Sequence, residues 1–187
     1  PTAQNVFSNS IAILVGDLLL ARASILSTDL GIEAITMQAN TFERLCIGQL
    51  NETVGVEGDE DPIAHYLQVL ADKTGSLIAA SAKLGVMIGN APERFLEPLS
   101  EFGEKVGVAF QLVDDVIDIS AAGPSGKTPG TDLRAGVPTL PVLLLRKLAK
   151  TDAAAAALIA EIDGDLSSDE RLAEVVEKLR NHPVAEE

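Results

Sequence analysis

A chain of 187 residues is long enough to build one hydrophobic core of ordinary size. It is 47% apolar but only 3% aromatic, and its formal net charge of −14 would repel a nucleic acid duplex or an anionic membrane surface, so we expect no nucleic acid partner. Its single cysteine, Cys46, excludes an intrachain disulfide and fits a reducing compartment, so we expect a cytoplasmic protein.

Helical periodicity dominates the first part of the chain, and no stretch alternates as a β-strand does. A first helix is predicted over about 3–27. The break at Asp29-Leu-Gly31 separates it from a second helix, which continues to about Val54.

The apolar stretch from Ile11 to Leu26 is the strongest candidate for a membrane span. Gly16-Asp17 and Arg22 interrupt it, so its uncharged parts are too short to cross a bilayer. It also lacks the basic flank and the small-residue cleavage site of a signal peptide. We therefore expect a buried core helix and no transmembrane segment.

Further along the chain, glycine and proline mark the boundaries of the predicted helices. The acidic turn 55–62 offers an N-cap aspartate and a proline at the first helical position. Helices are predicted over about 63–88, 93–119 and 138–150, followed by two short polar helices. Long helices with small or polar residues on otherwise apolar faces favour an all-α fold, a helical bundle around a central cavity. We treat residues 1–187 as a single domain.

The helix predicted over 93–119 carries four polar residues on one face. Gln111, Asp114, Asp115 and Asp118 fall at i, i+3, i+4 and i+7, with valine, isoleucine or leucine between them. Three carboxylates in apolar surroundings repel one another and are costly to desolvate unless a cation neutralises them. Mg²⁺ takes oxygen ligands from few carboxylates and from substrate phosphates, so this face is predicted to be a magnesium site. The alternative of a solvated helix face is disfavoured by the apolar surroundings.

Lys73-Thr74 interrupts the apolar pattern of the helix predicted over 63–88. Small residues follow, so a ligand could approach the backbone closely there. The alternative is a surface lysine whose stem lies along apolar groups, and the pattern alone leaves both interpretations open. In the preceding helix Gln49 and Glu52 share a face, as they also would on a solvated helix.

The segment Gly123-Pro-Ser-Gly-Lys-Thr128 is similar to a phosphate-binding loop. The nucleotide-binding pattern requires glycine where Ala121 stands and a strand before the loop, so we do not expect a nucleotide site. Lys127, on a glycine loop beside the aspartate-bearing helix, is instead predicted to place a positive charge over a diphosphate whose other oxygens meet the metal.

Several motifs occur together in the order found in one family. The segments 110–118, 126–133 and 136–141 resemble the second aspartate-rich region of the trans-isoprenyl diphosphate synthases. Upstream segments that are similar to motifs of the same family are 1–5, 13–22, 48–49 and 73–75. The resemblance covers nearly the whole chain, and the long-chain polyprenyl synthases of the quinone side-chain type are the most similar.

The resemblance implies an all-α isoprenoid synthase fold around a deep cavity, in a homodimer. It implies a prenyltransferase that joins isopentenyl diphosphate to an allylic diphosphate, with Mg²⁺ assisting the departure of diphosphate from an allylic cation. By position, the metal ligands would be Asp114, Asp115 and Asp118. Lys73 and Lys127 would contact the allylic diphosphate, while Thr74 and Gln111 would present oxygens to the cation.

The sequence departs from the family in two ways. Val137 stands where the family commonly has lysine, so one diphosphate contact is expected to be missing or supplied elsewhere. The family's first aspartate-rich motif would precede Pro1, and neither the residues that bind isopentenyl diphosphate nor the closing C-terminal helices are in the sequence. We therefore expect an internal portion of a larger enzyme, incomplete at both ends and inactive by itself.

Two other functions fit parts of the pattern. A non-catalytic partner subunit of a polyprenyl synthase would share the fold, but it would have little need of Asp114, Asp115, Asp118 and Lys127. A terpene cyclase also ionises a diphosphate, but its second metal motif is more often of an Asn/Ser/Glu type.

Overall fold

The computed structural model describes residues 2–120 and 129–185, and every regular element within these ranges is helical. The α-helices are α1 (Ala3–Phe7), α2 (Asn9–Thr28), α3 (Ile32–Val54), α4 (Pro62–Leu70), α5 (Ser76–Ile88), α6 (Leu96–Ile119), α7 (Thr131–Ala135), α8 (Leu140–Leu148), α9 (Ala153–Ile162) and α10 (Asp169–Arg180). A π-helical turn, η1 (Ala71–Gly75), joins α4 to α5, and two 3-10 turns are η2 (Glu93–Phe95) and η3 (Pro183–Ala185). The all-helical prediction is confirmed.

Glycines and a capping aspartate set the ends of the long helices. Gly31 and Gly55 flank α3 with φ of 90° and 79°, a region that glycine adopts without steric cost. At the start of α4, Asp61 Oδ1 accepts a hydrogen bond of 2.9 Å from the N–H of Ile63, and Pro62 takes the first helical position. The helix predicted over 63–88 is confirmed, with the π-turn in its middle.

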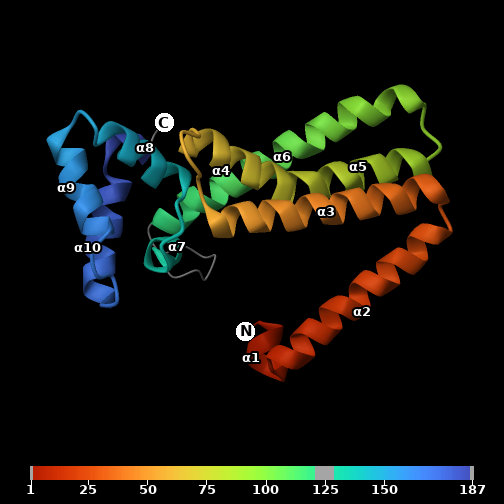
Figure 1. The fold of residues 1–187 in the computed structure, drawn as a ribbon, viewed down its shortest axis with the longest axis horizontal. Helices are drawn as coiled ribbons and strands as arrows, with labels where there is room; N and C mark the ends of the chain where they lie inside the picture. The colour runs from red at the N-terminus through yellow and green to blue at the C-terminus, as the bar shows by residue number, and fades with distance from the viewer. Residues whose placement is uncertain (1, 121–128, 186–187) are drawn as a thin grey trace.

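Helices α3, α5 and α6 run side by side and form the long part of the molecule (Figure 1). Small residues allow close approach between two of them. A Cβ atom added at Gly103 of α6 would lie 2.9 Å from the Cα of Ala79 of α5, so a larger residue would push the helices apart. This layer positions the residues that the sequence singles out.

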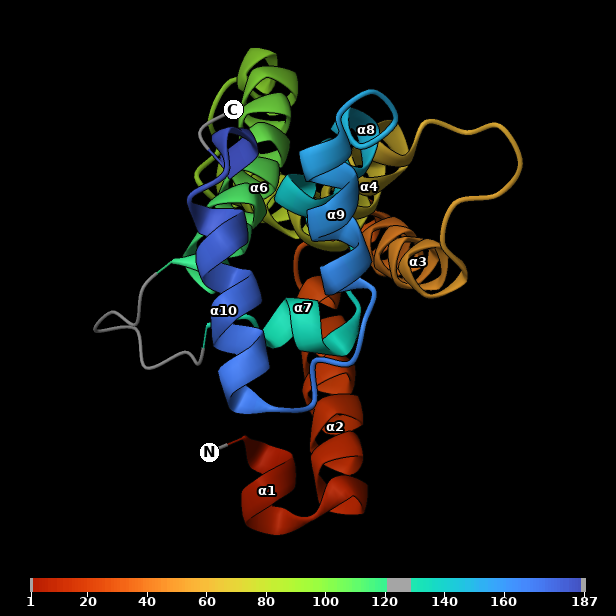
Figure 2. The ribbon, with the colours of Figure 1, turned by 90° about the vertical axis from the view of Figure 1, so that its left-hand side faces the viewer.

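The main hydrophobic core lies where α8, α9 and α10 pack on one another near the end of α6 (Figure 2). Leu145 of α8 and Val175 and Leu179 of α10 are completely buried. The two short helices predicted after 150 are confirmed as α9 and α10, but the prediction that both are polar is wrong for α9. The alanine-rich α9 is apolar, and α10 places its leucines and valines at helical spacing towards the core.

The first predicted helix is divided in two. Ser8 has φ of 109°, which ends α1 and makes α2 begin at Asn9. Helix α2 diverges from the layer of long helices, and none of its residues is buried within the described part of the chain (Figure 1). The expected core helix is therefore wrong for α2 as the structure places it.

The exposed surface of α2 is strongly apolar. Leu14, Leu18 and Leu19 are 66%, 61% and 64% exposed. Within residues 2–120 and 129–185, α2 is also the one helix that is long and apolar enough to cross a membrane by length and composition, although it contains Asp17 and Arg22. The expectation of no transmembrane segment is not confirmed by the structure.

Candidate functional site

Lys73 and Thr74 lie in the π-turn η1 rather than in regular α-helix. Such turns insert an extra residue into a helix and frequently occur at functional sites. Lys73 Nζ lies 2.6 Å from Glu52 Oε2 on α3, and Gln49 Nε2 donates a hydrogen bond of 2.8 Å to the same oxygen. The structure thus joins Lys73 to the Gln49/Glu52 pair, which disfavours an isolated surface lysine.

The π-turn is packed tightly between α3 and α6. A Cβ atom at Gly48 of α3 would lie 2.9 Å from the Cβ of Asp72. One at Gly107 of α6 would lie 2.6 Å from the Cα of Gly75 and 3.2 Å from the carbonyl carbon of Thr74. Only glycine allows backbones to approach this closely. Because Gln111 lies one helical turn beyond Gly107, the Lys73-Thr74 turn is adjacent to the aspartate-bearing part of α6.

Asp115 is buried against α4 and the start of α8. Its Oδ2 accepts a short hydrogen bond from the hydroxyl of Tyr66 and a second, of 3.2 Å, from the N–H of Leu140. Burial raises the pKa of Asp115 above its ordinary value, as do the charges of Asp114 and Asp118, while the two hydrogen bonds lower it. Burial also raises the pKa of Tyr66, which keeps its hydroxyl a proton donor. Asp115 therefore ties α6 to α4 and α8.

Asp118 is likewise buried and holds the start of α7. Its Oδ2 accepts a hydrogen bond of 3.1 Å from the N–H of Asp132, and its carbonyl oxygen accepts one of 2.7 Å from the N–H of Gly130. Gly130 is in the left-handed region, with φ of 78°, where α7 begins. The carboxylate thus caps a helical turn that follows it in the chain.

The residues fit Mg²⁺ only in part. Within the described ranges, no three Asp, Glu, His or Cys side chains converge where they could hold a metal ion together. Asp114 is half-buried on α6, one turn before Asp118, while Asp115 points to Tyr66. Mg²⁺ needs only one or two carboxylates when phosphate oxygens and water complete its octahedral shell. The donor set is therefore compatible with Mg²⁺, and Asp114, Asp115 and Asp118 as its ligands stay a prediction.

Of the two further positions predicted near the diphosphate, Lys127 and Val137, only Val137 lies in the described part of the chain. Lys127 lies outside the described residues. Val137 is half-buried and, with Tyr66 and Glu52, lines a small, largely apolar cavity of about 100 Å³. The position where a second lysine was expected is therefore in the immediate surroundings of the Lys73 and Asp115 contacts.

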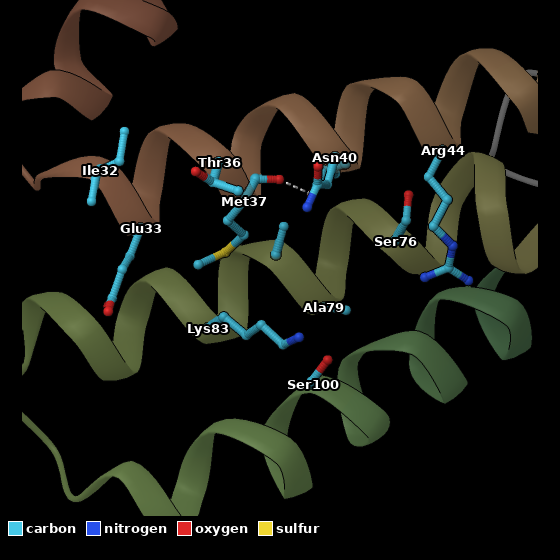
Figure 3. Close-up of a pocket in the computed structure, with 12 residues that line it drawn as sticks. Ile32, Glu33, Thr36, Met37, Asn40, Arg44, Ser76, Ala79, Lys83 and Ser100 are labelled. Carbon is cyan, nitrogen blue, oxygen red and sulfur yellow. Dashed lines mark hydrogen bonds between the residues drawn. The ribbon is translucent and has the colours of Figure 1, made fainter.

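A larger cavity, of about 500 Å³, lies between α3, α5 and α6 (Figure 3). Arg44 and Ser76 lie at one end of it, near the π-turn, and Met37, Asn40 and Lys83 lie further along. Among the described residues, none of those predicted for the site from the sequence lines it. The cavity follows the same helices as the candidate site but is displaced from it.

Sequence reasoning missed three residues that organise the site, namely Tyr66, Arg44 and Asp72. Arg44 Nε donates to Asp72 Oδ1 over 2.5 Å, and Arg44 Nη1 donates to Glu104 Oε2 over 2.6 Å. These partners lie in three different elements, so no local spacing joins them. The signal that could have indicated a special turn was the set of glycines at 48, 75 and 107.

A family model and the curated relatives that match this chain indicate the same protein family. The family model described as polyprenyl synthetase matches residues 1–179. A nonaprenyl diphosphate synthase of Mycobacterium tuberculosis is 45% identical over 184 residues, which are 98% of this chain and 54% of that protein. An octaprenyl diphosphate synthase of Haemophilus influenzae is 33% identical over 97% of this chain and 55% of its own length. The chain thus spans about half the length of these relatives.

Solved structures agree in fold. A geranylgeranyl pyrophosphate synthase from Corynebacterium glutamicum, complexed with calcium and isoprenyl diphosphate, matches with a TM-score of 0.82 and 43% identity over 99% of this chain and 57% of that chain. A decaprenyl diphosphate synthase from Rhodobacter capsulatus matches with a TM-score of 0.80 and 30% identity over 100% of this chain and 57% of its own. The fold class predicted from the sequence is confirmed. The chain belongs to the polyprenyl synthetase family.

Proposed function

We propose that the protein containing this chain is a trans-polyprenyl diphosphate synthase. It joins isopentenyl diphosphate to an allylic diphosphate, with formation of a C–C bond and release of diphosphate. Family membership supports this class of reaction. Because the chain spans about half of its relatives, the reaction is proposed for the whole protein and not for this portion alone.

One observation carries the assignment of the site to this chain. The π-turn with Lys73 and Thr74 packs backbone to backbone against α6 at Gly107, one turn before Gln111 and about two turns before Asp114. A cationic side chain and a carboxylate that are remote in sequence are thereby held on neighbouring helices. A diphosphate needs both kinds of group, because its charge must be met by a cation from the protein and by a metal held on a carboxylate.

Each residue then has a separate role. Lys73, which pairs with Glu52, would exchange that partner for an oxygen of the allylic diphosphate. Thr74 and Gln111 would present oxygens to the positive charge that develops as the diphosphate departs. Asp115 and Asp118 keep α4, α7 and α8 in place around the end of α6.

Asp114 is the carboxylate that would hold Mg²⁺, and bound Mg²⁺ would supply Lewis-acid assistance to the departure of the diphosphate. Lys127 would add a further cation to that diphosphate.

We further propose a cytoplasmic homodimer without a membrane span. The apolar surface of α2 supports an extensive contact, and a second copy of the chain is the proposed occupant. Asp17 and Arg22 within α2 would be costly in a bilayer, which supports a protein contact instead.

The test uses the full-length protein, isopentenyl diphosphate, an allylic diphosphate and MgCl₂. Reverse-phase analysis should show chain elongation that requires the metal. Lys73→Ala should raise the KM for the allylic diphosphate and lower kcat. A folded full-length protein that turns over only after addition of a second, different subunit would instead support the non-catalytic partner.

A further inference from the structure

The π-turn η1 is an unfavourable local structure that its surroundings hold in place. An α-helix that is continuous from Pro62 to Ile88 except for five π-helical residues has lost its regular hydrogen-bond pattern there. Such irregular backbone persists only where neighbouring groups over-determine it. Lys73 and Thr74 occupy this turn, so whatever fixes it also fixes them.

The glycine contacts fix the position of the turn but not its register. Gly48 and Gly107 let α3 and α6 approach η1 from two sides. These are van der Waals contacts, which do not hold any polar group of the turn in a fixed direction. If η1 relaxed to α-helix, one residue would be displaced and the side chains on one side of it would rotate by about 100°. A directional contact is needed to prevent that rotation.

Arg44 supplies the directional contact. Its guanidinium bridges Asp72 within the π-turn to Glu104 on α6, with donor–acceptor distances of 2.5 and 2.6 Å. In Figure 3 its side chain extends from α3 past Ser76 towards α6. Two acceptors in different elements fix the orientation of a planar guanidinium, which a lysine could not reproduce.

Asp72 is committed to this contact from every side. It is only 6% exposed, and its other carboxylate oxygen accepts a hydrogen bond of 2.9 Å from Gln68 Nε2. Its carbonyl oxygen accepts one of 2.6 Å from the hydroxyl of Ser76. Asp72 is adjacent in the chain to Lys73. A rotation that moved Lys73 would therefore also break the ion pair between Arg44 and Asp72.

We propose that Arg44 is a positioning residue for the diphosphate site: through Asp72 and Glu104 it holds η1 in the π-helical register that presents Lys73 and Thr74. The proposal rests on the proposed function, because it assumes that Lys73 and Thr74 contact the allylic diphosphate. Arg44 itself touches no substrate.

The test compares variants of the full-length enzyme. Arg44→Met should lower kcat/KM for the allylic diphosphate by on the order of 10- to 100-fold, the size expected for a misplaced binding group. The KM for isopentenyl diphosphate should not change. Arg44→Met/Asp72→Asn removes both charges, so it leaves no buried unpaired carboxylate, and it should show the same kinetic loss with a thermal midpoint closer to wild type.

A double-mutant cycle with Lys73→Ala separates the possible outcomes. If Arg44 acts through Lys73, adding Arg44→Met to Lys73→Ala should cause little further loss. The proposal would be overturned if the losses of kcat/KM from Arg44→Met and Lys73→Ala were additive. Wild-type kinetics of Arg44→Met/Asp72→Asn, or failure of both Arg44 variants to fold, would also overturn it. A Lys73→Ala enzyme with wild-type kinetics would instead overturn the proposed function of the site.

Arg146→Met is the matched control. Arg146 also forms a two-point ion pair, with Asp163, but that pair lies between α8 and the end of α9 and away from η1. Its loss should leave the KM for the allylic diphosphate unchanged. An equal rise in KM in this control would show that any lost arginine pair disturbs the site, and would also overturn the proposal.

Discussion

The hydroxyl of Tyr66 on α4 donates a hydrogen bond to the carboxylate of Asp115 on α6, 49 positions away in the sequence. Asp115 belongs to the face predicted to bind metal, yet its Oδ2 is occupied by Tyr66 and by the N–H of Leu140. The Tyr66 hydroxyl and the Leu140 N–H donate to the same oxygen, and both contacts join helices of the fold. One carboxylate oxygen of Asp115 is therefore used by structural contacts, and its role as a metal ligand stays a prediction.

Tyr66→Phe should destabilise the protein. The substitution keeps the ring but leaves the buried Asp115 with one hydrogen bond fewer, which costs about 1–3 kcal/mol. Urea unfolding of the full-length protein measures this directly. Asp115→Asn is the matched control, because its amide oxygen can still accept from both donors while the buried charge is removed. Equal unfolding free energies for wild type and Tyr66→Phe would contradict the structural role of this contact.

Asp114→Ala and Asp115→Asn should differ in activity. Asp114→Ala removes the proposed Mg²⁺ carboxylate, so most turnover should be lost while the protein stays folded. If Asp115 serves the structure and not the metal, as proposed above, Asp115→Asn keeps its hydrogen bonds and should retain most turnover. Both are assayed at limiting and at saturating Mg²⁺, with circular dichroism as the folding control. Wild-type turnover of Asp114→Ala at limiting Mg²⁺ would exclude the assignment.

Gly107→Ala should be strongly unfavourable. Its Cβ would lie 2.6 Å from the Cα of Gly75, and backbone cannot move aside as a side chain can. We expect a loss of about 1–3 kcal/mol or more from this overpacking, and a lower kcat/KM because η1 shifts. Gly85→Ala is the control, since nothing lies within 4 Å of its added Cβ and alanine favours helix by about 0.5–1 kcal/mol. Similar thermal midpoints for the two variants would contradict the close packing.

The helices themselves could be predicted from the sequence, because periodicity and the Gly/Pro boundaries are local signals. The start of α4 at Pro62 follows from Asp61 and Pro62 alone. The π-turn could not be predicted in this way, since its close packing on Gly48 and Gly107 and its ion pair with Arg44 all involve other helices. The break at Ser8 was missed because serine rarely adopts φ of 109° and nothing in the pattern indicates it.

The candidate site was predictable in composition but not in arrangement. The spacing of Asp114, Asp115 and Asp118 indicates one face, and it cannot show that Asp115 meets Tyr66 or that Asp118 caps α7. The partners in those contacts lie in other helices, which come next to α6 only when the chain folds. Arg44 carried no signal at all, since its two carboxylate partners lie 28 and 60 residues away.

The ion pair between Arg146 and Asp163 should make stability depend on pH in acid. The hydrogen bond from Arg146 lowers the pKa of Asp163 below the ordinary aspartate value. A lowered folded-state pKa means that the pair stabilises the protein above the unfolded pKa, about 3.9, and that this contribution is lost as pH falls through the folded value. Asp163 is half exposed, so the pair contributes only about 0.2–1 kcal/mol. Asp163→Asn should therefore have a slightly lower thermal midpoint than wild type at pH 7. This difference in midpoint should vanish near pH 2. A difference that persists at that pH would show that it does not arise from the ion pair.

The apolar surface of α2 should be covered by a second copy of the chain. Leu18 is 61% exposed on this helix, and Leu14 and Leu19 extend the same surface. Leu18→Asp would place a charge in the contact, so the full-length protein should shift from dimer to monomer in light scattering after size exclusion. Ala157→Asp, on an exposed position of α9 in the other part of the molecule, should remain dimeric.

Membrane insertion of α2 makes the opposite prediction, since wild type would then float with phosphatidylcholine vesicles and Leu18→Asp would not. The dimer is supported if wild type stays in the aqueous fraction and only Leu18→Asp dissociates, because the apolar area then serves a protein contact; flotation of wild type would refute it.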